Sequence, residues 1–365
     1  MFVTVRSFAK INLGLRIGGV RADGFHELLT VYQIIALHDV IRVSMRRGRG
    51  IEIICADPRV PRDESNTCFR IVDRAMSALR AKGRVVVEIE KRLPVQGGLG
   101  GASANAVATL LALERALKKT LPAAERLRIT AEVGSDLPLF LVGGTVLGVG
   151  RGEQVYPLPD LPAMPCVVVT PEVGVSTPKA FAGWDRLCGA GTPAREAVST
   201  LPAFQEPAGL RPARTGEGAR PHTSISFHTS PNKLTPSPSS DRMVKLGCGL
   251  SAWLSEPYSS APSEFLARGG RAENPLLWLV RAGIENDFEQ VVFPEYPELR
   301  DGKRALLRAG AKYASLSGSG STLYGLFASR QSAVAAASKL RKQGWAAQAT
   351  ATLTRRQYWS RIFDC

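Results

Sequence analysis

Hydrophobic and polar positions in the first 160 residues follow two different periods, which predict a series of strands and helices. Apolar positions that alternate or run together, as in β-strands, occur over 3–9, 31–43, 51–54, 85–90 and 141–149. Helical spacing, with Asn66 and Thr67 as candidate caps for the first helix, occurs over 67–79, 106–117 and 123–133. The first part of the chain is therefore predicted to be a domain that mixes helices and strands.

The remaining residues predict a second domain that is interrupted by a segment of different composition. Predicted strands and helices occur at 166–170, from 176, and over 299–308, 323–327, 334–342 and 346–353, with ordered sequence resuming near 276. Their order favours an open α/β sandwich. Between about 187 and 271 the residues Pro, Ser, Gly, Thr and Arg dominate, and this composition predicts a flexible insertion.

The most distinctive stretch is the glycine-rich run 94–105, which lies between a predicted strand and a predicted helix. Its glycines allow the backbone to approach a ligand, Ser103 and Asn105 are suited to cap the helix, and a helix N-terminus favours a phosphate. Ala102 after Gly101 excludes a Walker loop, and Ser103 stands where a dinucleotide-binding fingerprint needs its third glycine. The run is either a phosphate-binding loop of another kind or a tight strand-to-helix connection.

Three polar side chains that lie in apolar segments or next to a turn are candidate functional residues. Lys10 lies inside the first predicted strand, where an ammonium needs an anionic partner or a ligand unless it faces solvent from an edge. Asp136 stands among apolar residues just before a proline, where a carboxylate either works in a site or caps the next turn. His26 follows an Asp-Gly turn and is either functional or a hydrogen-bonded turn histidine.

Composition narrows the class of protein without fixing it. No apolar stretch approaches the roughly twenty residues of a membrane span and the start lacks a secretory pattern, so a cytoplasmic location is expected. The six cysteines form no Cys-x-x-Cys pair, which is typical of reduced thiols. A net charge of +15 suits nucleic acid, an anionic surface or phosphorylated metabolites, so a basic RNA-binding protein is an alternative, although no clustered basic stripe is found.

Three stretches together resemble the GHMP small-molecule kinase superfamily. They are 9–13 with 21–28, then 93–105, and finally the second glycine-rich run 317–322. The glycine loop is shared across the superfamily, whereas the first stretch resembles the branch that acts on a cytidine-diphosphate-linked methylerythritol. The resemblance covers residues 1–186 and 273–365.

This resemblance implies an α+β fold of two domains with the active site in the cleft between them. Residues 1–160 would form a ribosomal-protein-like domain and residues 161–365 a ferredoxin-like α/β sandwich. The implied reaction is ATP-dependent phosphorylation of the 2-hydroxyl group of 4-(cytidine diphospho)-2-C-methyl-D-erythritol, in the non-mevalonate isoprenoid precursor pathway. ATP is the expected phosphoryl donor and Mg²⁺ is expected between its phosphates, with its protein ligands unassigned. No nucleic acid or membrane partner is expected.

The resemblance also implies roles for single residues. Asp136 would take the proton of the hydroxyl group, and Lys10 would keep that carboxylate ionised and neutralise charge on the phosphoryl group. The loop 317–322 would line the phosphate side of the cleft. The expected ATP-binding residues are Pro94, Val95, Gln96, Gly97, Gly98, Leu99, Gly100, Gly101, Ala102, Ser103 and Ala104.

The substrate side carries a second set of implied residues, in which aromatic rings suit a flat base. Phe25 and His26 would lie near the cytosine and Phe181 would offer a stacking face. The complete expected set is Asn12, Phe25, His26, Thr177 and Phe181.

Two features depart from the superfamily pattern, and one alternative within it stays open. The insertion 187–271 has no expected counterpart, and Gln96 stands where a glycine is common. A kinase of the same superfamily that acts on a homoserine-type or mevalonate-type acceptor would keep the catalytic pair and the glycine loop. That alternative leaves Phe25 and His26 without a role.

Overall fold

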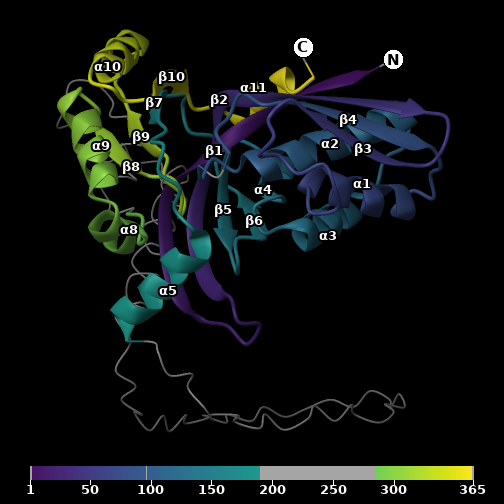
Figure 1. The fold of residues 1–365 in the computed structure, drawn as a ribbon, viewed down its shortest axis with the longest axis horizontal. Helices are drawn as coiled ribbons and strands as arrows, with labels where there is room; N and C mark the ends of the chain where they lie inside the picture. The colour runs from purple at the N-terminus through teal and green to yellow at the C-terminus, as the bar shows by residue number, and fades with distance from the viewer. Residues whose placement is uncertain (1, 96, 190–284, 364–365) are drawn as a thin grey trace, which may run out of the picture.

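The computed structural model describes residues 2–95, 97–189 and 285–363, which form two β-sheets with helices packed on them (Figure 1). The strands are β1 (Val3–Val20), β2 (His26–Arg46), β3 (Gly50–Cys55), β4 (Arg84–Glu90), β5 (Thr145–Val149), β6 (Gln154–Pro157), β7 (Pro165–Val169), β8 (Tyr313–Leu316), β9 (Leu323–Leu326) and β10 (Ala347–Ala351). The helices are α1 (Thr67–Ala78), α2 (Gly101–Leu117), α3 (Ala123–Val133), α4 (Leu139–Val142), α5 (Thr177–Cys188), α8 (Glu289–Glu295), α9 (Pro297–Arg308), α10 (Arg330–Lys342) and α11 (Arg355–Arg361).

The described strands form two separate sheets. The first has the order β3-β4-β2-β5-β6, with β1 paired to β2, and the second has the order β10-β7-β9-β8. In Figure 1, α1 and α2 lie on the first sheet with α3 beside α1, and α9 and α10 lie beside the second sheet. The predicted α+β class is confirmed. The domain boundary between 160 and 161 stays a prediction, and the C-terminal residues return to the first sheet, where the amide of Arg6 donates to the carbonyl of Ile362.

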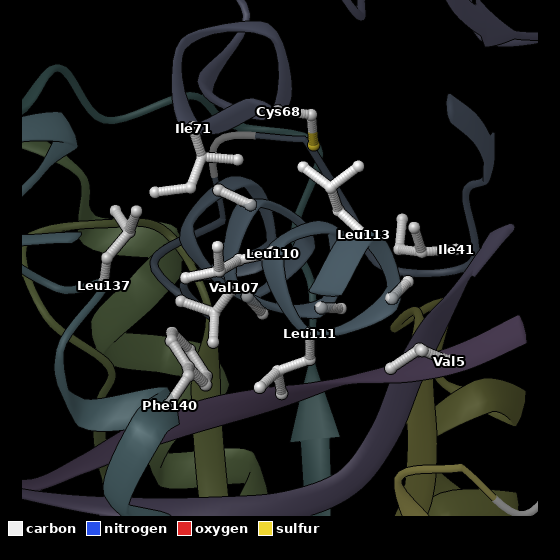
Figure 2. Close-up of a cluster of buried hydrophobic side chains, with 14 of the residues drawn as sticks. Val5, Ile41, Cys68, Ile71, Val107, Leu110, Leu111, Leu113, Leu137 and Phe140 are labelled. Atoms are coloured by element: carbon white, nitrogen blue, oxygen red, sulfur yellow. The ribbon is translucent and has the colours of Figure 1, made fainter. Parts of the chain in front are cut away.

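Helix α2 forms the centre of the first half because almost its whole length is apolar. Its residues from Ala104 to Leu113 are buried between α1 and the first sheet, and Figure 2 shows Val107 and Leu110 between Ile71 and Phe140. Burying one such leucine side chain stabilises a fold by about 1.5–3 kcal/mol. This packing anchors the C-terminal end of the glycine loop, since the loop runs directly into α2.

The long strand β1 crosses from one half of the molecule to the other. Its buried side chains enter three hydrophobic clusters in turn, with Val5 in the first, Ile11 in the second and Ile17 in the third. Lys10 lies between the first two of these positions, so β1 carries it to the junction of the halves.

Two details of the predicted elements are wrong. Helix α2 begins at Gly101 and its N-cap is Gly100, so Ser103 and Asn105 lie inside the helix rather than capping it. The predicted strand pair over 141–149 is a strand only from Thr145, because Leu139–Val142 forms the short helix α4 whose apolar side packs into the core.

The predicted insertion begins slightly too early, because α5 continues to Cys188. The rest of that insertion, from 190, lies outside the described residues, as do Gln96 and the predicted return of order at 276–282. The described cysteines Cys55, Cys68, Cys166 and Cys188 are free thiols, as predicted. Among the described helices, none is both long and apolar enough to cross a membrane.

Candidate active site

Lys10 is buried, and its ammonium group has the anionic partner that the sequence requires. Its Nζ donates a hydrogen bond to Oδ1 of Asn12 (2.6 Å) and lies 3.6 Å from Oδ2 of Asp136. Burial lowers the pKa of Lys10 from its usual value, and the Asp136 carboxylate partly opposes that shift. The alternative of a lysine facing solvent from a strand edge is wrong.

Asp136 lies in the turn between α3 and α4, with its side chain 35% exposed. Its Oδ1 accepts a hydrogen bond from the hydroxyl group of Tyr32 (3.1 Å), while Oδ2 faces Lys10. Burial, and then the charge of Asp136, raise the pKa of Tyr32 well above its usual value, so this hydroxyl keeps its proton and donates it to the carboxylate. No side-chain cap forms at the start of α4, so the capping alternative for Asp136 is also wrong.

Asn12 holds Lys10 from the opposite side. Its amide Nδ2 donates to Oγ1 of Thr30 (2.8 Å), and that hydroxyl donates to the carbonyl of Gly14 (2.7 Å). The amide orientation leaves Oδ1 directed at the ammonium group of Lys10. Because each polar atom in this buried chain has a partner, the lysine is held in one place.

The glycine loop 94–105 packs directly against the second glycine-rich loop, 317–322. The amide of Thr322 donates to the carbonyl of Gly97 (3.0 Å), and Oγ of Ser317 donates to the carbonyl of Gly98 (3.0 Å). Gly98 has a φ of +82°, and a Cβ at this position would overlap the Ser317 carbonyl oxygen. A Cβ at Gly320 would lie 2.6 Å from the Gly98 nitrogen. The close approach of two backbones therefore requires glycine here.

Two residues that the sequence reading missed hold these loops in place. Asn286 is buried, and its Nδ2 donates to the carbonyls of Leu316 (2.9 Å) and Gly318 (2.8 Å) at the base of the second loop. Asp39 is buried and accepts hydrogen bonds from the amide of Leu93 (2.8 Å) and from Nδ2 of Asn105 (3.0 Å). Asp39 thus joins the segment before the first loop to the helix after it. Neither residue lies in a motif that marks it in the sequence.

The first turn of α2 presents unpaired amide groups next to this loop. The N–H groups of Gly101, Ala102 and Ser103 have no protein acceptor in the described part of the chain. They line a cavity of about 380 Å³ together with Thr67 and Lys91. Lys91 is ion-paired with Asp39 (2.5 Å), so the free amides at the positive end of the helix are the groups that suit the binding of phosphate.

A second cavity, of about 720 Å³, lies on the other side of the loop and contains the proposed catalytic pair. Its lining includes Lys10, Asp136, Gly98 and Gly318 at one end. Thr177 enters this wall from the start of α5, where its hydroxyl lies 2.8 Å from that of Ser319. The structure thereby brings Thr177 to the glycine loops rather than to the aromatic end of the cavity.

The opposite end of this cavity holds the predicted base-binding residues. The ring of His26 stacks on that of Phe181 with centroids 4.8 Å apart, and Phe181 meets Phe288 edge to face. His26 Nε2 lies 2.7 Å from Oδ1 of Asp185, a residue that the sequence reading missed. Because an ionised carboxylate only accepts, this contact places a hydrogen on Nε2 and leaves Nδ1 for a ligand.

Phe25 lies at the mouth of the same end and is 52% exposed. The guanidinium group of Arg151 sits 4.9 Å from the centre of its ring. The sequence reading did not single out Arg151, because an isolated arginine near a turn carries no signal. The expected stacking face of Phe181 is covered by His26 in this structure, which leaves Phe25 as the exposed ring.

Comparison with known proteins agrees with this geometry. The profile of the GHMP kinases N terminal domain matches residues 66–144, which include the glycine loop, and that of the GHMP kinases C terminal domain matches residues 276–345. The fold and the paired glycine loops therefore define a GHMP kinase, a small-molecule kinase that uses ATP as phosphoryl donor.

Relatives across nearly the whole chain narrow this class. A 4-diphosphocytidyl-2-C-methyl-D-erythritol kinase from Solibacter usitatus (strain Ellin6076) is 34% identical over 326 residues, which cover 89% of this chain and 81% of that protein. The enzyme of the same name from Oleidesulfovibrio alaskensis is 35% identical over 344 residues, covering 91% of this chain and 93% of that protein. The chain belongs to the family of 4-diphosphocytidyl-2-C-methyl-D-erythritol kinases, which confirms the predicted resemblance and does not support the RNA-binding alternative.

Solved structures agree with this family. The crystal structure of a 4-(cytidine 5'-diphospho)-2C-methyl-D-erythritol kinase superposes with a TM-score of 0.63 and 26% identity, covering 96% of this chain and 98% of the other. A homoserine kinase from Cytophaga hutchinsonii superposes with a TM-score of 0.62 at 20% identity, covering 97% and 95%, and this likeness shows the shared fold alone.

Proposed function

We propose that this chain transfers the γ-phosphoryl group of ATP to the 2-hydroxyl group of 4-(cytidine 5'-diphospho)-2-C-methyl-D-erythritol. The observation that carries the proposal is the content of one cavity of about 720 Å³. Lys10, Asp136 and both glycine loops lie at one end of it, and His26 with its aromatic partners lies at the other. Such a cavity suits an acceptor that has a flat base at one end and a hydroxyl group at the other.

The glycine loop fits the role of phosphate cradle. The amides of Gly101, Ala102 and Ser103 have no protein acceptor among the described residues, and Lys91, which is ion-paired with Asp39, lines the same cavity. The 380 Å³ cavity gives the nucleoside part of ATP a place on the side of the loop away from Asp136. The transferred group then lies where the loop reaches Lys10, because Gly98 and Gly100 line the catalytic cavity as well.

The catalytic pair fits phosphoryl transfer, which depends mainly on positioning and on neutralising charge. Asp136 accepts the proton as the hydroxyl oxygen forms its bond to phosphorus and ADP leaves. Tyr32 fixes one oxygen of this carboxylate, so the other oxygen is the one that faces the reacting groups and Lys10. Lys10 supplies a positive charge that is held still by Asn12, so it stabilises negative charge on the phosphoryl oxygens with little reorganisation.

The aromatic end fits a cytosine base. Phe25 offers an exposed ring, and His26 offers the one ring nitrogen that Asp185 leaves free. A homoserine-type or mevalonate-type acceptor has no aromatic base for these groups. They therefore favour the cytidylyl substrate over the other members of the superfamily.

Magnesium is proposed as the ion that neutralises the phosphates of ATP. In residues 2–95, 97–189 and 285–363 no group of three or more His, Cys, Asp and Glu side chains is placed to hold a metal. This arrangement fits an ion that enters with the nucleotide and is bound mainly by phosphate oxygens and water. A cytoplasmic location stays a prediction from the sequence.

The test is an acceptor panel with the purified chain, ATP and Mg²⁺. The panel contains the cytidylylated methylerythritol, homoserine and mevalonate, and phosphorus NMR identifies the phosphorylated position in the product. We expect turnover of the cytidylylated acceptor at its 2-hydroxyl group. Turnover of homoserine or mevalonate alone would overturn the proposal.

An Asp136→Asn variant tests the assignment of the base in the same assay. Loss of the proton acceptor should lower turnover by about 10²–10⁴-fold while the affinity for ATP changes little. The matched control is Asp301→Asn, because Asp301 is exposed on α9, away from the cavity. Full activity of the Asp136→Asn variant would show that Asp136 is not the catalytic base.

A further inference from the structure

A groove of about 620 Å³ lies between the two sheets and shares no lining residue with either cavity described above. One wall is the segment 36–38 of β2, and the other consists of the start of α10 and the strand β10. Arg361 of α11 and the segment 92–93 complete the lining. Figure 1 shows α10, β10 and α11 along the same upper edge of the molecule. We call this site the arginine groove.

The charged groups of the arginine groove are positive. Its lining contains Arg92, Arg330 and Arg361 and no carboxylate. Arg92 is already compensated, since its Nη2 lies 2.5 Å from Oε1 of Glu90. Within the described part of the chain, Arg330 and Arg361 have no carboxylate within the 4.0 Å of an ion pair. Two arginines that line the groove therefore carry a positive charge without an anionic partner.

The other polar side chains of the groove, His38, Gln348 and Thr350, carry no negative charge. The Nδ1 of His38 lies 2.9 Å from the carbonyl of Ala36, so Nδ1 carries the hydrogen that this carbonyl accepts. The other ring nitrogen, Nε2, lies 3.4 Å from Nη1 of Arg92 and accepts from it. Both ring nitrogens of His38 thus have protein partners, and Arg330 and Arg361 supply the free positive charge.

Apart from Gln348 and Thr350 of β10, the rest of the lining is mostly apolar. Leu93 and Ala333 are buried at its base, while Val334 of α10 is 50% exposed beside Arg330. Ala349 and Ala351 add small side chains from β10. An apolar trough with guanidinium groups at its rim fits a ligand that has an apolar body and an anionic head.

We propose that the arginine groove binds a small organic phosphate whose body is apolar. A phosphate monoester carries about −1.5 to −2 charges at neutral pH, which matches two uncompensated guanidinium groups better than a carboxylate does. Arginine also binds phosphate oxygens through two parallel hydrogen bonds. This site is additional to the kinase reaction, because it shares no lining residue with the catalytic cavity.

The test is calorimetric titration of the whole chain with 1-naphthyl phosphate. The variant is Arg330→Glu with Arg361→Gln, and the matched control is Arg47→Glu with Arg300→Gln, which changes the net charge equally at exposed positions away from the groove. Glutamate is compatible with position 330, since this is the first residue of α10 and negative charge is favourable there. We expect the groove variant to bind at least tenfold more weakly and the control to bind within twofold of the unmodified chain.

Two further measurements separate this site from the active site and from nonspecific charge. Kinase turnover of the groove variant should stay within twofold of the unmodified chain, which also shows that it folds. Val334→Asp, a single change at an exposed position, should weaken binding of the probe as well. The proposal would be overturned if the groove variant bound the probe as tightly as the unmodified chain does, or if the control variant lost as much affinity as the groove variant. It would also be overturned if the unmodified chain did not bind the probe.

Discussion

The contact between the two glycine loops gives the sharpest quantitative prediction, for the change Gly98→Ala. Gly98 has a φ of +82°, which disfavours any residue with a Cβ by about 1–2 kcal/mol. In addition, the new methyl group would overlap the backbone oxygen of Ser317 and lie 3.2 Å from the Cα of Gly320. Both neighbours are backbone atoms, so the overlap cannot be relieved by turning a side chain, and overpacking of this kind costs about 1–3 kcal/mol.

The matched control is Gly310→Ala. Gly310 has a φ of +99°, and a Cβ there would meet nothing within 4 Å. Its substitution therefore carries the cost of the backbone conformation alone. Both variants also lose the same conformational freedom in the unfolded chain, so their difference isolates the clash between the loops.

The free energy of unfolding, measured by urea titration, should fall by about 2–5 kcal/mol for Gly98→Ala and by about 1–2 kcal/mol for Gly310→Ala. Because the first loop must move away from the second, Gly98→Ala should also raise the KM for ATP by about tenfold or more, and Gly310→Ala should leave it unchanged. Equal losses of stability in the two variants, with an unchanged KM for ATP, would refute the close packing of the loops as the reason for glycine.

Three other variants test single contacts of the site. Tyr32→Phe removes the hydrogen-bond donor to Asp136. A hydrogen bond to a charged group is worth about 1.5–3 kcal/mol, so kcat should fall about tenfold while the KM for ATP stays unchanged. Steady-state kinetics that match the unmodified chain would contradict this prediction. In Asp185→Asn, His26 loses its charged partner. This change should raise the KM for the cytidylylated acceptor about fivefold and leave kcat unchanged. An effect on the KM for ATP instead would contradict a role of Asp185 in base recognition. Lys10→Met tests the lowered pKa of the lysine. Between the pKa of Lys10 in the folded chain and 10.5, the unfolded chain binds a proton that the folded chain lacks. The free energy of unfolding of the unmodified chain therefore rises with pH across this interval. Urea titrations across the same interval should show a smaller rise in the variant.

Much of the site could be predicted from the sequence because its chemistry is local. Lys10 inside an apolar strand required a partner, and the glycine-rich run before an Ala-rich and Leu-rich helix required a phosphate or a tight turn. The structure shows the tight connection, since Gly98 is needed for the contact with the second loop, while phosphate binding stays a prediction that the free amides of the first turn of α2 support. Motifs shared with the GHMP kinases linked Lys10 and the glycine-rich run to one active site.

Other parts could not be predicted, because they depend on residues that are distant in the chain. Asp185 meets His26 only when α5 packs against the end of β2, and their 159-residue separation leaves no pattern to read. Asn286 supports the second glycine loop in the same way, through carbonyls of another strand end. The error at α2 has a local cause, because a glycine in the left-handed region can act as N-cap where a serine was expected.

What the sequence determined by itself is the set of elements and the residue types suited to phosphoryl transfer, because hydrophobic periodicity, glycine and buried charge act over a few neighbouring residues. What only the tertiary structure decided is the meeting of those groups. Lys10 from the first strand lies 3.6 Å from an aspartate 126 positions further along the chain, and the second glycine loop packs against the first. Both contacts form because β1 runs through three hydrophobic clusters and holds the two halves together. The distances that make a site out of these residues come from that packing.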